Sequence, residues 1–556
     1  MTPGDPATLQ ALCEQALAMH RAGRLDEAAQ LYDRVLQRDP KHADALHLLG
    51  MLQVQKGQLE AGASLIQRAI RANPAFPAAH SHLGMALWRL SRPCEALASY
   101  DAAIALKPDY AEAHNSRGIV LGELARHDEA LASHEVAIAL QPHDPQAHYN
   151  RGVQLQHLGR LTEALASLDQ TITLNPVYAE AHNNRGTALY DLGRPFEALA
   201  SYDNAIALNP SYAEAHRNRG LALSDLHRLD EALASYDTAI ALRPDDAAAW
   251  KGRGLTRLLA GGLMDGWRDY EHRKAGWEPA AREFDRARSW SGECDIEGQR
   301  FFVRHEQGLG DTIQFARYVA LLAARGAKVA FSVQTPLREL LQAAMPEADV
   351  LGEDEEPASF DYQCSAMSLP LAFETTLDSI PPPPRWRGAD TERRAHFEAT
   401  LGHRTKPRVG IAWSGNPTHK NDHNRSIAFQ QLSPLLSRDF DWVAMQNVIR
   451  PSDTAAFEAD GRVRHFGDAL KTFADTAALI DLMDLVVTVD TSIAHLAGSM
   501  GKPVWILLPF SPDWRWMLNR SDSPWYPTAR LFRQSAIGDW NGVMHEVTGA
   551  LPTLSD

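Results

Sequence analysis

The stretch EAHNNRGTALYDLGRPFEALASYDNAIALNP (180–210) decides the fold of the N-terminal half. Two helix-forming segments lie on either side of the short turn DLGRP, and Pro210 ends the second of them. Gly186 and Ala198 are small, and we expect the two helices to approach closely there. One helix pair cannot bury its apolar face alone, so this stretch predicts a unit that stacks on similar neighbours.

The small and helix-ending residues of this stretch recur every 34 residues. The prolines are Pro40, Pro74, Pro108, Pro142, Pro176, Pro210 and Pro244, and the glycines are Gly50, Gly84, Gly118, Gly152, Gly186, Gly220 and Gly254. Alanines keep the same phase at Ala28, Ala96, Ala130, Ala164, Ala198 and Ala232, with Gly62 in the remaining place. This period resembles the tetratricopeptide repeat (TPR). It predicts a tail at 1–8 and an all-α superhelical array at 9–275, with seven full repeats and a divergent eighth.

A row of rings also keeps the phase of the repeat. It comprises His80, His114, His148, His182 and His216, followed by Trp250. A ladder of metal ligands is one interpretation of the histidines. We favour rings that pack between helices, because an aromatic is usual at this position of a TPR and Trp250 takes the last place.

A second row in phase consists of amides on the first helix of each repeat. Asn150, Asn184 and Asn218 form this row, after Ser116. The first helices line the concave face of a TPR superhelix, where amides can hydrogen-bond an extended peptide whatever its side chains. The row resembles that of TPR-bearing O-GlcNAc transferases. A groove for a protein acceptor and a solvated polar face remain two open interpretations.

After Trp250 the sequence alternates between short apolar strands and helices. The first series has strands at 301–306 and 328–333, with helices at 308–326 and 335–345. The second has strands at 407–413, 441–446, 485–489 and 503–508, with helices near 428–437, 474–483 and 491–501. Such alternation predicts parallel sheets with right-handed crossovers.

Four consecutive prolines at 381–384 mark a boundary inside this half, because they fit neither a helix nor an inner strand. The prediction is a linker at 276–297, a Rossmann-like unit at 298–385, a second linker at 386–405 and a second Rossmann-like unit at 406–556. In open parallel sheets ligands bind at the carboxyl ends of the strands.

Two motifs lie where a strand ends and a helix begins, EQGLGD (306–311) and VDTSIAHLAG (489–498). Helix N-termini suit phosphate, because their N–H groups are unpaired and the helix dipole is positive there. Gly308 and Gly310 let the backbone approach a ligand. Asp311 and Asp490 project from the two junctions, although either carboxylate alone could be a helix N-cap.

These motifs, together with the loop GIAWSGNPTHKNDHNRS (410–426), resemble the heptosyltransferase-type glycosyltransferases of family 9, which have the GT-B fold of two Rossmann-like units. The resemblance covers roughly 298–545. It implies that Asp311 is the catalytic base. It also implies that the donor nucleotide and its phosphates contact the matching DTxxxH residues, which are Asp490, Thr491, Ser492 and His495.

Other residues near the predicted cleft are weaker candidates. Lys420, His423 and Arg425 lie in the polar loop and are candidate phosphate partners, with a solvated loop as the alternative and Arg425 favoured, because arginine can bind phosphate through two bonds. Gln446 ends a strand and is a candidate contact of the base or ribose. The Trp-Arg-Trp run at 514–516 either stacks a sugar or base or is buried between domains.

Composition limits the class of function. The 556 residues include 55 Lys and Arg against 70 Asp and Glu, a formal net charge of −15, which argues against a nucleic-acid binder. Four cysteines without a CxxC pair favour a reducing cytoplasm. We find no signal peptide, no transmembrane segment and no DxD pair at a strand end, so we expect no metal and no cofactor beyond a nucleotide sugar.

The sequence therefore predicts a cytoplasmic, inverting, metal-independent glycosyltransferase that moves a sugar from a nucleotide donor to a protein held by the TPR array. TPR arrays fused to such a domain resemble a bacterial group linked to protein glycosylation, including that of flagellin. The nucleotide stays open. Two alternatives remain, a TPR scaffold with a non-catalytic transferase-like domain and a glycosyltransferase that acts on a glycan or lipid.

Overall fold

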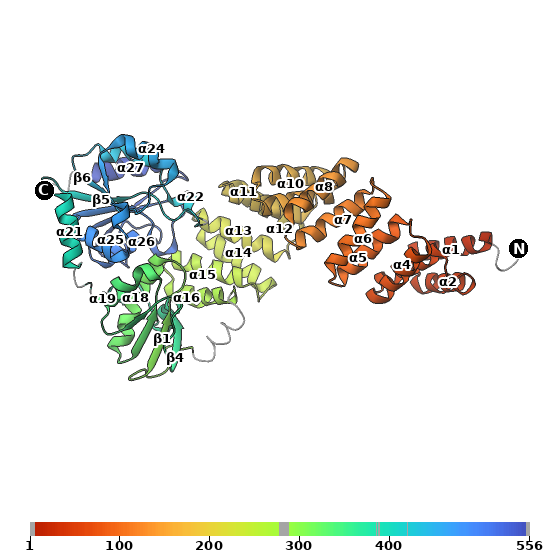
Figure 1. Cartoon of the computed structure of the whole chain (residues 1–556), viewed down its shortest axis with the longest axis horizontal. Coiled ribbons are helices and arrows are strands. Elements are labelled where there is room, and N and C mark those ends of the chain that lie inside the picture. Colours follow the sequence, from red (N-terminus) through yellow and green to blue (C-terminus); the bar gives the residue numbers. More distant parts are fainter. Residues whose placement is uncertain (1–5, 277–288, 385, 387–389, 420, 552–556) are drawn as a thin grey trace. The chain divides into compact units, whose positions relative to one another are not determined.

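The computed structural model describes residues 6–276, 289–384, 386, 390–419 and 421–551. It divides into two units, Met1–Arg219 and Gly220–Asp556, which we call the array unit and the α/β unit. The predicted fold class is confirmed. Helix pairs fill the array unit, and the α/β unit holds two parallel sheets with their covering helices (Figure 1).

The array unit consists of one helix pair per repeat. Its helices are α1 (Pro6–Arg21), α2 (Leu25–Arg38), α3 (Ala43–Gln55), α4 (Leu59–Ala72), α5 (Pro77–Arg89), α6 (Pro93–Leu106), α7 (Ala111–Glu123), α8 (His127–Leu140), α9 (Pro145–His157), α10 (Leu161–Leu174), α11 (Ala179–Asp191) and α12 (Pro195–Leu208), while α13 (Ala213–Asp225) crosses the division between the units. The first helices of consecutive pairs contact one another, as α5 and α7 do. The first helices therefore share one side of the array.

The recurring glycine makes room for a large side chain of the second helix in the same pair. A Cβ atom at Gly186 would lie 2.5 Å from Cε1 of Tyr202, and one at Gly118 would lie 2.5 Å from Cε1 of His134. The same spacing of 16 residues pairs Gly84 with Tyr100, Gly152 with Leu168 and Gly220 with Tyr236. Glycine therefore recurs in the sequence at the position where the two helices of each pair pack too closely for a side chain.

The row of histidines forms a hydrogen-bonded seam between repeats. The ring Nε2 of each one bonds the carbonyl oxygen of the proline six residues before it, as His182 does to Pro176 at 3.0 Å. The same bond occurs at His80, His114, His148 and His216, and Trp250 donates its Nε1–H to the carbonyl of Pro244. The described residues contain no cluster of three or more potential metal ligands.

The α/β unit begins with helices of the repeat array. These are α14 (Leu229–Leu242), α15 (Ala247–Leu259), α16 (Leu263–Tyr270) and the short 3-10 helix η1 (Glu271–Gly276). The pair α15 and α16 is the divergent eighth repeat, and its second helix is short.

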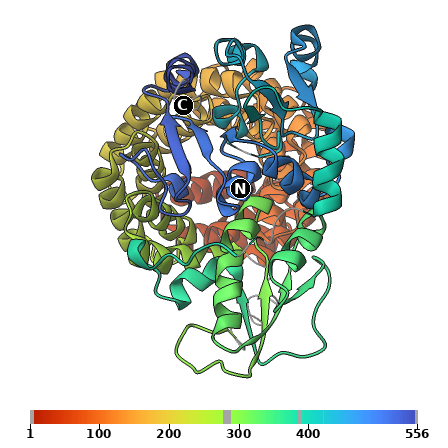
Figure 2. The ribbon, with the colours of Figure 1, turned by 90° about the vertical axis from the view of Figure 1, so that its left-hand side faces the viewer.

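The smaller sheet has four parallel strands in the order β3-β2-β1-β4, drawn as green arrows in Figure 2. The strands are β1 (Arg300–Arg304), β2 (Lys328–Ser332), β3 (Asp349–Leu351) and β4 (Tyr362–Ser365), and the helices are α18 (Leu309–Ala324), η2 (Thr335–Leu337), α19 (Arg338–Ala344), η3 (Ala366–Ser368), α20 (Leu369–Ala372) and η4 (Leu377–Ser379). In register, Phe302 of β1 lies opposite Ala330 of β2 and Gln363 of β4. The central position of β1 places the turn that follows it at the middle of the sheet edge.

The larger sheet has six parallel strands in the order β10-β9-β8-β5-β6-β7. Its strands are β5 (Arg408–Ala412), β6 (Asp441–Ala444), β7 (Val463–His465), β8 (Leu485–Val489), β9 (Val504–Leu508) and β10 (Ala529–Arg533). Its helices are α22 (Asp422–Arg425), η5 (Phe429–Leu432), α23 (Ser433–Leu436), α24 (Pro451–Asp460), η6 (Gly467–Ala469), α25 (Phe473–Asp481), α26 (Ser492–Ser499), η7 (Trp514–Trp516) and α27 (Trp540–Ala550). Strands β5 and β8 are buried along their whole length and neighbour each other at the centre.

The eighth repeat is part of the core of the α/β unit. The sequence prediction instead places this repeat in the array, which is expected to end at residue 275. Trp267 of α16 packs edge to face on Phe315 of α18, with ring centroids 6.3 Å apart, and on Trp514, at 5.1 Å. Leu258 and Leu263 belong to the same buried cluster. The apolar face that ends the repeat array is covered by the α/β helices instead of by another repeat.

The segment predicted as a linker at 386–405 contains the helix α21 (Thr391–Leu401), whose Phe397 and Leu401 are buried against α25. Asp390 caps this helix by accepting from the backbone N–H groups of Glu392 and Arg393. The proline run itself has no regular structure in its described residues. Its Pro381 carbonyl accepts from the buried guanidinium of Arg317 at 3.0 Å.

Candidate functional site

The first element of the site is the turn between β1 and α18. Gly308 is the N-cap of α18, and its N–H donates to Oδ2 of Asp311 at 2.8 Å. Gln307 has a positive φ of 65°, which is uncommon outside glycine. Two bonds hold it there, because its Nε2 donates to the Tyr270 hydroxyl at 2.7 Å and its carbonyl accepts from Gln334 at 3.1 Å.

The second element is the junction between β8 and α26. Asp490 follows the last residue of β8, and Thr491 is the N-cap of α26, with its hydroxyl accepting from the N–H of Ile493 at 3.3 Å. Ser492 is the first residue of the helix. The junction presents a carboxylate together with the N-terminus of a helix that begins with two hydroxyl residues.

The two junctions meet through Gly310 and His495. A Cβ atom at Gly310 would lie 2.7 Å from Cδ2 of the His495 ring, so the ring lies directly against the turn. The Nδ1 of His495 is 2.9 Å from the hydroxyl of Tyr526, and the ring stacks on Trp516 with centroids 5.4 Å apart. Burial lowers the pKa of His495 far below its usual value, so the ring is neutral. His495 therefore holds the two motifs together.

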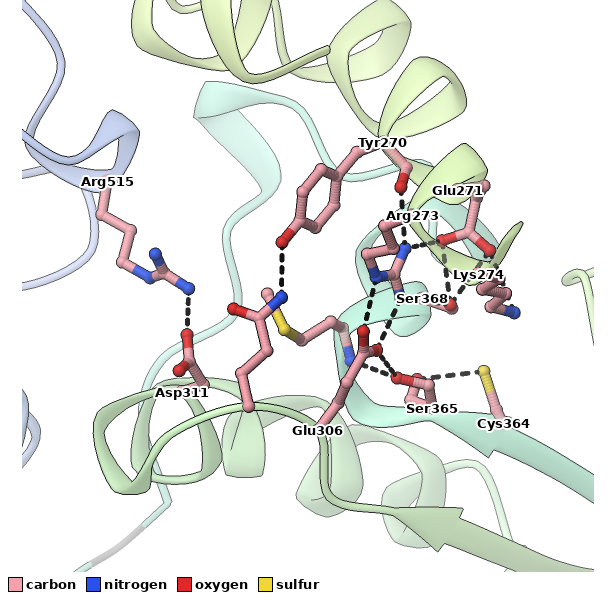
Figure 3. Close-up of polar contacts among 12 residues, drawn as sticks. Tyr270, Glu271, Arg273, Lys274, Glu306, Asp311, Cys364, Ser365, Ser368 and Arg515 are labelled. Atoms are coloured by element: carbon pink, nitrogen blue, oxygen red, sulfur yellow. Dashed lines mark hydrogen bonds and ion pairs between the residues drawn. The ribbon is translucent and has the colours of Figure 1, made fainter. Parts of the chain in front are cut away.

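Arg515 joins the two junctions by charge. Its Nη2 forms an ion pair with Oδ1 of Asp311, and its Nη1 donates to Oδ1 of Asp513 at 2.8 Å (Figure 3 shows the pair with Asp311). Its guanidinium lies 4.4 Å from the centroid of the Trp514 ring. Burial raises the pKa of Asp311, whereas Arg515 and the Gly308 N–H lower it.

Asp490 is the titratable group of the second junction. Burial and the nearby charge of Asp513 raise the pKa of Asp490 to about 6, and Arg425 opposes them. Arg425 lies beside Asp490, since its Nη1 donates to the Asp490 carbonyl oxygen at 3.1 Å. The planar guanidinium packs over Gly415, where a Cβ atom would lie 2.7 Å from Nη2. The structure thus brings Asp311, Asp490 and Arg425 into one electrostatic cluster around Arg515.

The polar loop 414–426 reaches this cluster. Charges that perturb the pKa of His419 include Arg425, Asp513 and Asp311, while burial is the main cause of its lowering. The loop is anchored at Asp422, which accepts from Arg450 at 2.7 Å and from the Ser426 hydroxyl at 2.8 Å. Lys420, a candidate phosphate ligand, lies outside the described residues.

Gln446 bonds protein groups through both atoms of its amide. Its Oε1 accepts from the N–H groups of Trp413 and Ser414 at 2.7 and 3.1 Å, and its Nε2 donates to the Ser414 hydroxyl at 3.0 Å. The side chain is buried and fastens the end of β5 to the end of β6. This arrangement makes it a support of the polar loop, which differs from the predicted contact with a base or ribose.

The eighth repeat contacts the strand ends of the smaller sheet through a buried ion network (Figure 3). Arg273 donates to both carboxylate oxygens of Glu306 at 2.8 Å and pairs with Glu271 at 2.6 Å. Its side chain is only 3% exposed. Ser365 and Ser368 complete the network by donating to Glu306 and Glu271. Glu306 directly precedes Gln307, so this network fixes the start of the turn that carries Asp311.

The predicted amide row lies in hydrogen bonds between repeats. Asn150 donates to Asn115 at 3.1 Å, and Asn184 donates to the Tyr149 hydroxyl at 3.1 Å. In both bonds the acceptor residue lies 35 residues before the donor. Asn218 likewise donates to Asn183 at 3.0 Å. Asn150 is buried, whereas Asn184 and Asn218 are partly exposed on the first helices. Each amide reaches the first helix of the preceding repeat.

Several residues of the site have no motif that reveals them. Trp514 and Trp516 are buried, which agrees with the interpretation of the Trp-Arg-Trp run as a buried segment. Arg515, between them in the sequence, is the ion partner of Asp311. Tyr270 and Arg273 belong to a segment that sequence reasoning treats as the end of the array. Their only signal is that the 34-residue period stops there and the segment is rich in aromatic and charged residues.

No helix within the described residues combines the length and the apolar character that crossing a bilayer requires. This finding agrees with the sequence, which shows no long apolar run.

Family models match both halves of the chain. Tetratricopeptide-repeat models match residues 19–86, 95–125, 115–179, 155–213, 183–247 and 217–265. The model of glycosyltransferase family 9 (heptosyltransferase) matches residues 471–512, which run from just before α25 through Asp490, Thr491, Ser492 and His495 to the loop that follows β9. The chain therefore joins TPR repeats to a region that resembles a family 9 glycosyltransferase. The match includes the second junction of the site and ends before Asp513.

Among known proteins, Protein FlbA of Caulobacter vibrioides is 27% identical over 325 residues, which are 53% of this chain and 54% of that protein. The chain spans about half the length of this curated relative. Among solved structures, the TPR protein YrrB, described as having an unusual peptide-binding site, is 27% identical with a TM-score of 0.30, over 34% of this chain and 96% of YrrB. PilF of Pseudomonas aeruginosa is 20% identical with a TM-score of 0.35, over 37% of this chain and 94% of PilF.

Proposed function

We propose that the chain is a glycosyltransferase that moves a sugar from a nucleotide donor to a protein acceptor held by its repeat array. The observation that carries the proposal is the contact of Gly310 with His495. It brings the turn with Asp311 against the helix that belongs to the family 9 match. Two strand ends of two parallel sheets then face one site, as in the GT-B arrangement.

Asp311 is the proposed general base. It takes the proton of the acceptor hydroxyl while the acceptor oxygen forms a bond to the anomeric carbon of the sugar. The bond from that carbon to the phosphate oxygen breaks, and its electron pair leaves with the nucleotide. One displacement inverts the configuration. The N-terminus of α26, with Thr491 and Ser492, and the guanidinium of Arg425 stabilise the charge on the leaving phosphate.

Three further features belong to the same proposal. Arg425 and the helix dipole take the role that a metal ion has in other transferases, so the reaction proceeds without metal. The array binds the acceptor protein on the side of its first helices, where Asn184 and Asn218 are partly exposed. The reaction takes place in the cytoplasm, and flagellin is the acceptor that the family resemblance suggests.

The first test is a thermal-shift panel of UDP, ADP, GDP, CDP and CMP on the full chain. Tryptophan fluorescence suits the test, because Trp88 is the one tryptophan of 13 that precedes residue 220, and so twelve report on the α/β unit. A ligand at 100 times its Kd stabilises the state that binds it by about 2.7 kcal/mol. We expect one nucleotide to stabilise the wild type and to lose much of its effect in Arg425→Gln. If no nucleotide shifts the transition, the donor site is wrong and the scaffold alternative gains.

The second test is Asp311→Asn with the nucleotide sugar that the panel selects. We expect transfer to the acceptor to fall by about a thousandfold or more, because general-base catalysis contributes about 10² to 10⁴ in rate. Nucleotide affinity should stay near that of the wild type, since Asp311 does not contact the donor in this proposal. A variant with near-normal transfer would show that another group is the base.

A further inference from the structure

The ion pair of Asp311 and Arg515 is almost enclosed by protein. The side chain of Asp311 is 15% exposed and that of Arg515 is 8% exposed. Arg515 donates to one carboxylate oxygen of Asp311, and the N–H of Gly308 donates to the other. A carboxylate oxygen accepts more than one hydrogen bond, so room remains for an acceptor hydroxyl.

The guanidinium of Arg515 is fixed on three further sides. Its Nε donates to Oε1 of the buried Gln314 at 2.6 Å, and its Nη1 donates to Asp513 at 2.8 Å. The flat face lies on the Trp514 ring, 4.4 Å from its centroid. A guanidinium held in this way has one orientation, and its remaining nitrogen, Nη2, points at Asp311.

The charges around Asp311 would otherwise favour the protonated acid. Asp513 on the η7 side and Glu306 on the β1 side both raise the pKa of Asp311, in addition to burial. His419 of the polar loop also faces it, and Tyr270 of α16 faces Arg515. The neutral ring of His495 lies against the turn. Among the influences that lower the pKa of Asp311, the positive charge of Arg515 is the largest.

We propose that Arg515 is a positioning residue that holds Asp311 as an oriented carboxylate, ready to accept a proton. This proposal rests on the role of Asp311 as the base. It gives the Trp-Arg-Trp run a function in the reaction, because Trp514 stacks on the arginine that controls the base and Trp516 stacks on His495. A general base must be both ionised and correctly aimed, and one bond to Arg515 supplies both conditions.

The first experiment measures the coupling of the two residues without donor or acceptor. Thermal denaturation of the full chain is followed by tryptophan fluorescence at pH 8 for the wild type, Asp311→Asn, Arg515→Gln and the double variant. In the wild-type background we expect Asp311→Asn to lower the Tm, because it removes one of the two carboxylates that pair with the buried Arg515. In the Arg515→Gln background we expect the same substitution to raise the Tm, because it removes an unpaired buried charge. Equal Tm changes in both backgrounds would overturn the proposal.

The same set at pH 5 tests the protonation state directly. In Arg515→Gln the buried Asp311 takes up a proton as the pH falls, so the stabilising effect of Asp311→Asn should shrink or disappear. If that effect is as large at pH 5 as at pH 8, the charge of Asp311 is not what Arg515 controls. Should Arg515→Gln fold only together with Asp311→Asn, that result supports the proposal. If neither Arg515→Gln nor the double variant folds, Arg515→Lys takes the place of Arg515→Gln. In the Arg515→Lys background, Asp311→Asn should still lower the Tm.

The second experiment is the pH profile of sugar transfer. The acid limb of kcat/KM should move to higher pH in Arg515→Gln, and activity should recover in part at alkaline pH. Arg515→Lys keeps the charge and should keep the limb near its wild-type position. Arg520→Gln is the matched control, because Arg520 pairs with Asp522 in the same segment, at 2.8 Å, away from Asp311. A rate lowered equally at every pH would show that Arg515 acts only through the fold.

The outcomes separate this inference from the proposed function. If the Tm effects reverse sign as described while Asp311→Asn transfers sugar normally, then Arg515 controls the charge of Asp311 but Asp311 is not the base. If Asp311→Asn abolishes transfer while the Tm effects are equal, then the base is correct and the role of Arg515 is wrong.

Discussion

At the scale of the residue, the site depends on how closely a few atoms approach. Gly310 and His495 show this best, because the ring occupies the space of a side chain at position 310. His495 cannot withdraw easily, since it is buried between Trp516 and Tyr526. A single methyl group at Gly310 is therefore a sensitive probe of whether the two junctions must touch.

We predict that Gly310→Ala destabilises the α/β unit by about 1–3 kcal/mol, the usual cost of overpacking. It should also weaken nucleotide binding, because the turn and α26 are pushed apart. Gly549→Ala is the matched control, since no atom lies within 4 Å of its Cβ position in α27. That control should be neutral or stabilising by up to about 1 kcal/mol. Denaturation followed by tryptophan fluorescence measures both, and a neutral Gly310→Ala would show that the contact is not tight.

The pKa of Asp490 leads to a prediction about pH. Its folded pKa of about 6 lies above the unfolded value near 3.9, so the ionised carboxylate costs stability. This cost is absent below about pH 4, grows between about pH 4 and pH 6, and is complete above about pH 7. Asp490→Asn should therefore raise the stability of the α/β unit by roughly 1–3 kcal/mol at pH 8.

The gain from Asp490→Asn should fade as the pH is lowered to about 4, where the wild-type group is already protonated. Asp539→Asn is a control of opposite sign, because hydrogen bonds from the Gly542 N–H and the Ser535 hydroxyl lower the pKa of that partly exposed carboxyl. Removing Asp539 should cost stability at pH 8 and less in acid. Fluorescence melts between pH 4 and pH 8 measure both variants, and a gain from Asp490→Asn that ignores pH would contradict the assignment.

At the scale of the element, every repeat contains one left-handed residue in the turn between its two helices. Five of these residues are glycines, namely Gly23, Gly57, Gly159, Gly193 and Gly261, and the other three are Ser91, Ala125 and His227. They follow one another at intervals of 34. A Cβ atom makes this conformation sterically unfavourable. Glycine avoids that clash and instead loses more backbone entropy on folding, which costs less.

We predict that Ala125→Gly stabilises the array unit by about 0.5–1 kcal/mol, because φ is +57° and the side chain is exposed. Gly159→Ala is the matched reverse change in the next repeat, with φ at +70° and open space around it. It should cost a similar amount. Circular dichroism melts of the helical signal measure both, and changes of the same sign would mean that the turn conformation is not what limits stability.

The elements also show what a sequence can predict. Strands β5, β8 and β9 and helices α18 and α26 lie within one or two residues of their predicted bounds, because a buried parallel strand is a run of apolar residues and a glycine or threonine marks each junction. Strands β3, β4, β7 and β10 are not among the predictions. They are only three to five residues long and some are partly exposed, so their patterns are weak.

The same limit applies to the site. The motifs reveal Asp311 and Asp490, because each follows a strand and precedes a helix. Arg515 as the partner of Asp311 is not visible in the sequence, because 204 residues separate the two and the pairing depends on how the sheets pack. The Tyr270 and Gln307 contact is hidden for the same reason. Chemistry that local sequence encodes can be predicted, and partners brought together by tertiary packing cannot.

At the scale of the whole molecule, the eighth repeat couples the array to the transferase-like region. Its helix α16 supplies Trp267 to the core, and Tyr270 and Arg273 reach the turn that carries Asp311. Repeat arrays need a terminal cap, and the α/β helices supply it here. The fusion of the two regions is thus more than a tether, since part of one is built into the other.

This organisation predicts which fragments fold. A fragment of residues 298–556 loses seven buried side chains of the shared core, Leu258, Leu259, Leu263, Trp267, Tyr270, Trp290 and Ile296. Each contributes about 1.5–3 kcal/mol by burial, and together they reach the whole net stability of an average domain, about 5–15 kcal/mol. We therefore expect this fragment to be insoluble or to melt without a cooperative transition.

A fragment of residues 213–556, which begins with α13, should instead melt cooperatively near the temperature of the α/β unit in the full chain. It should also bind the nucleotide selected by the thermal-shift panel with a similar Kd, because every residue of the donor site is present. Transfer to a protein acceptor should be lost, since the array that holds the acceptor is missing, while slow hydrolysis of the nucleotide sugar persists. Cooperative folding of 298–556 alone would show that the eighth repeat is only a linker, and full protein transfer by 213–556 would show that the array does not bind the acceptor.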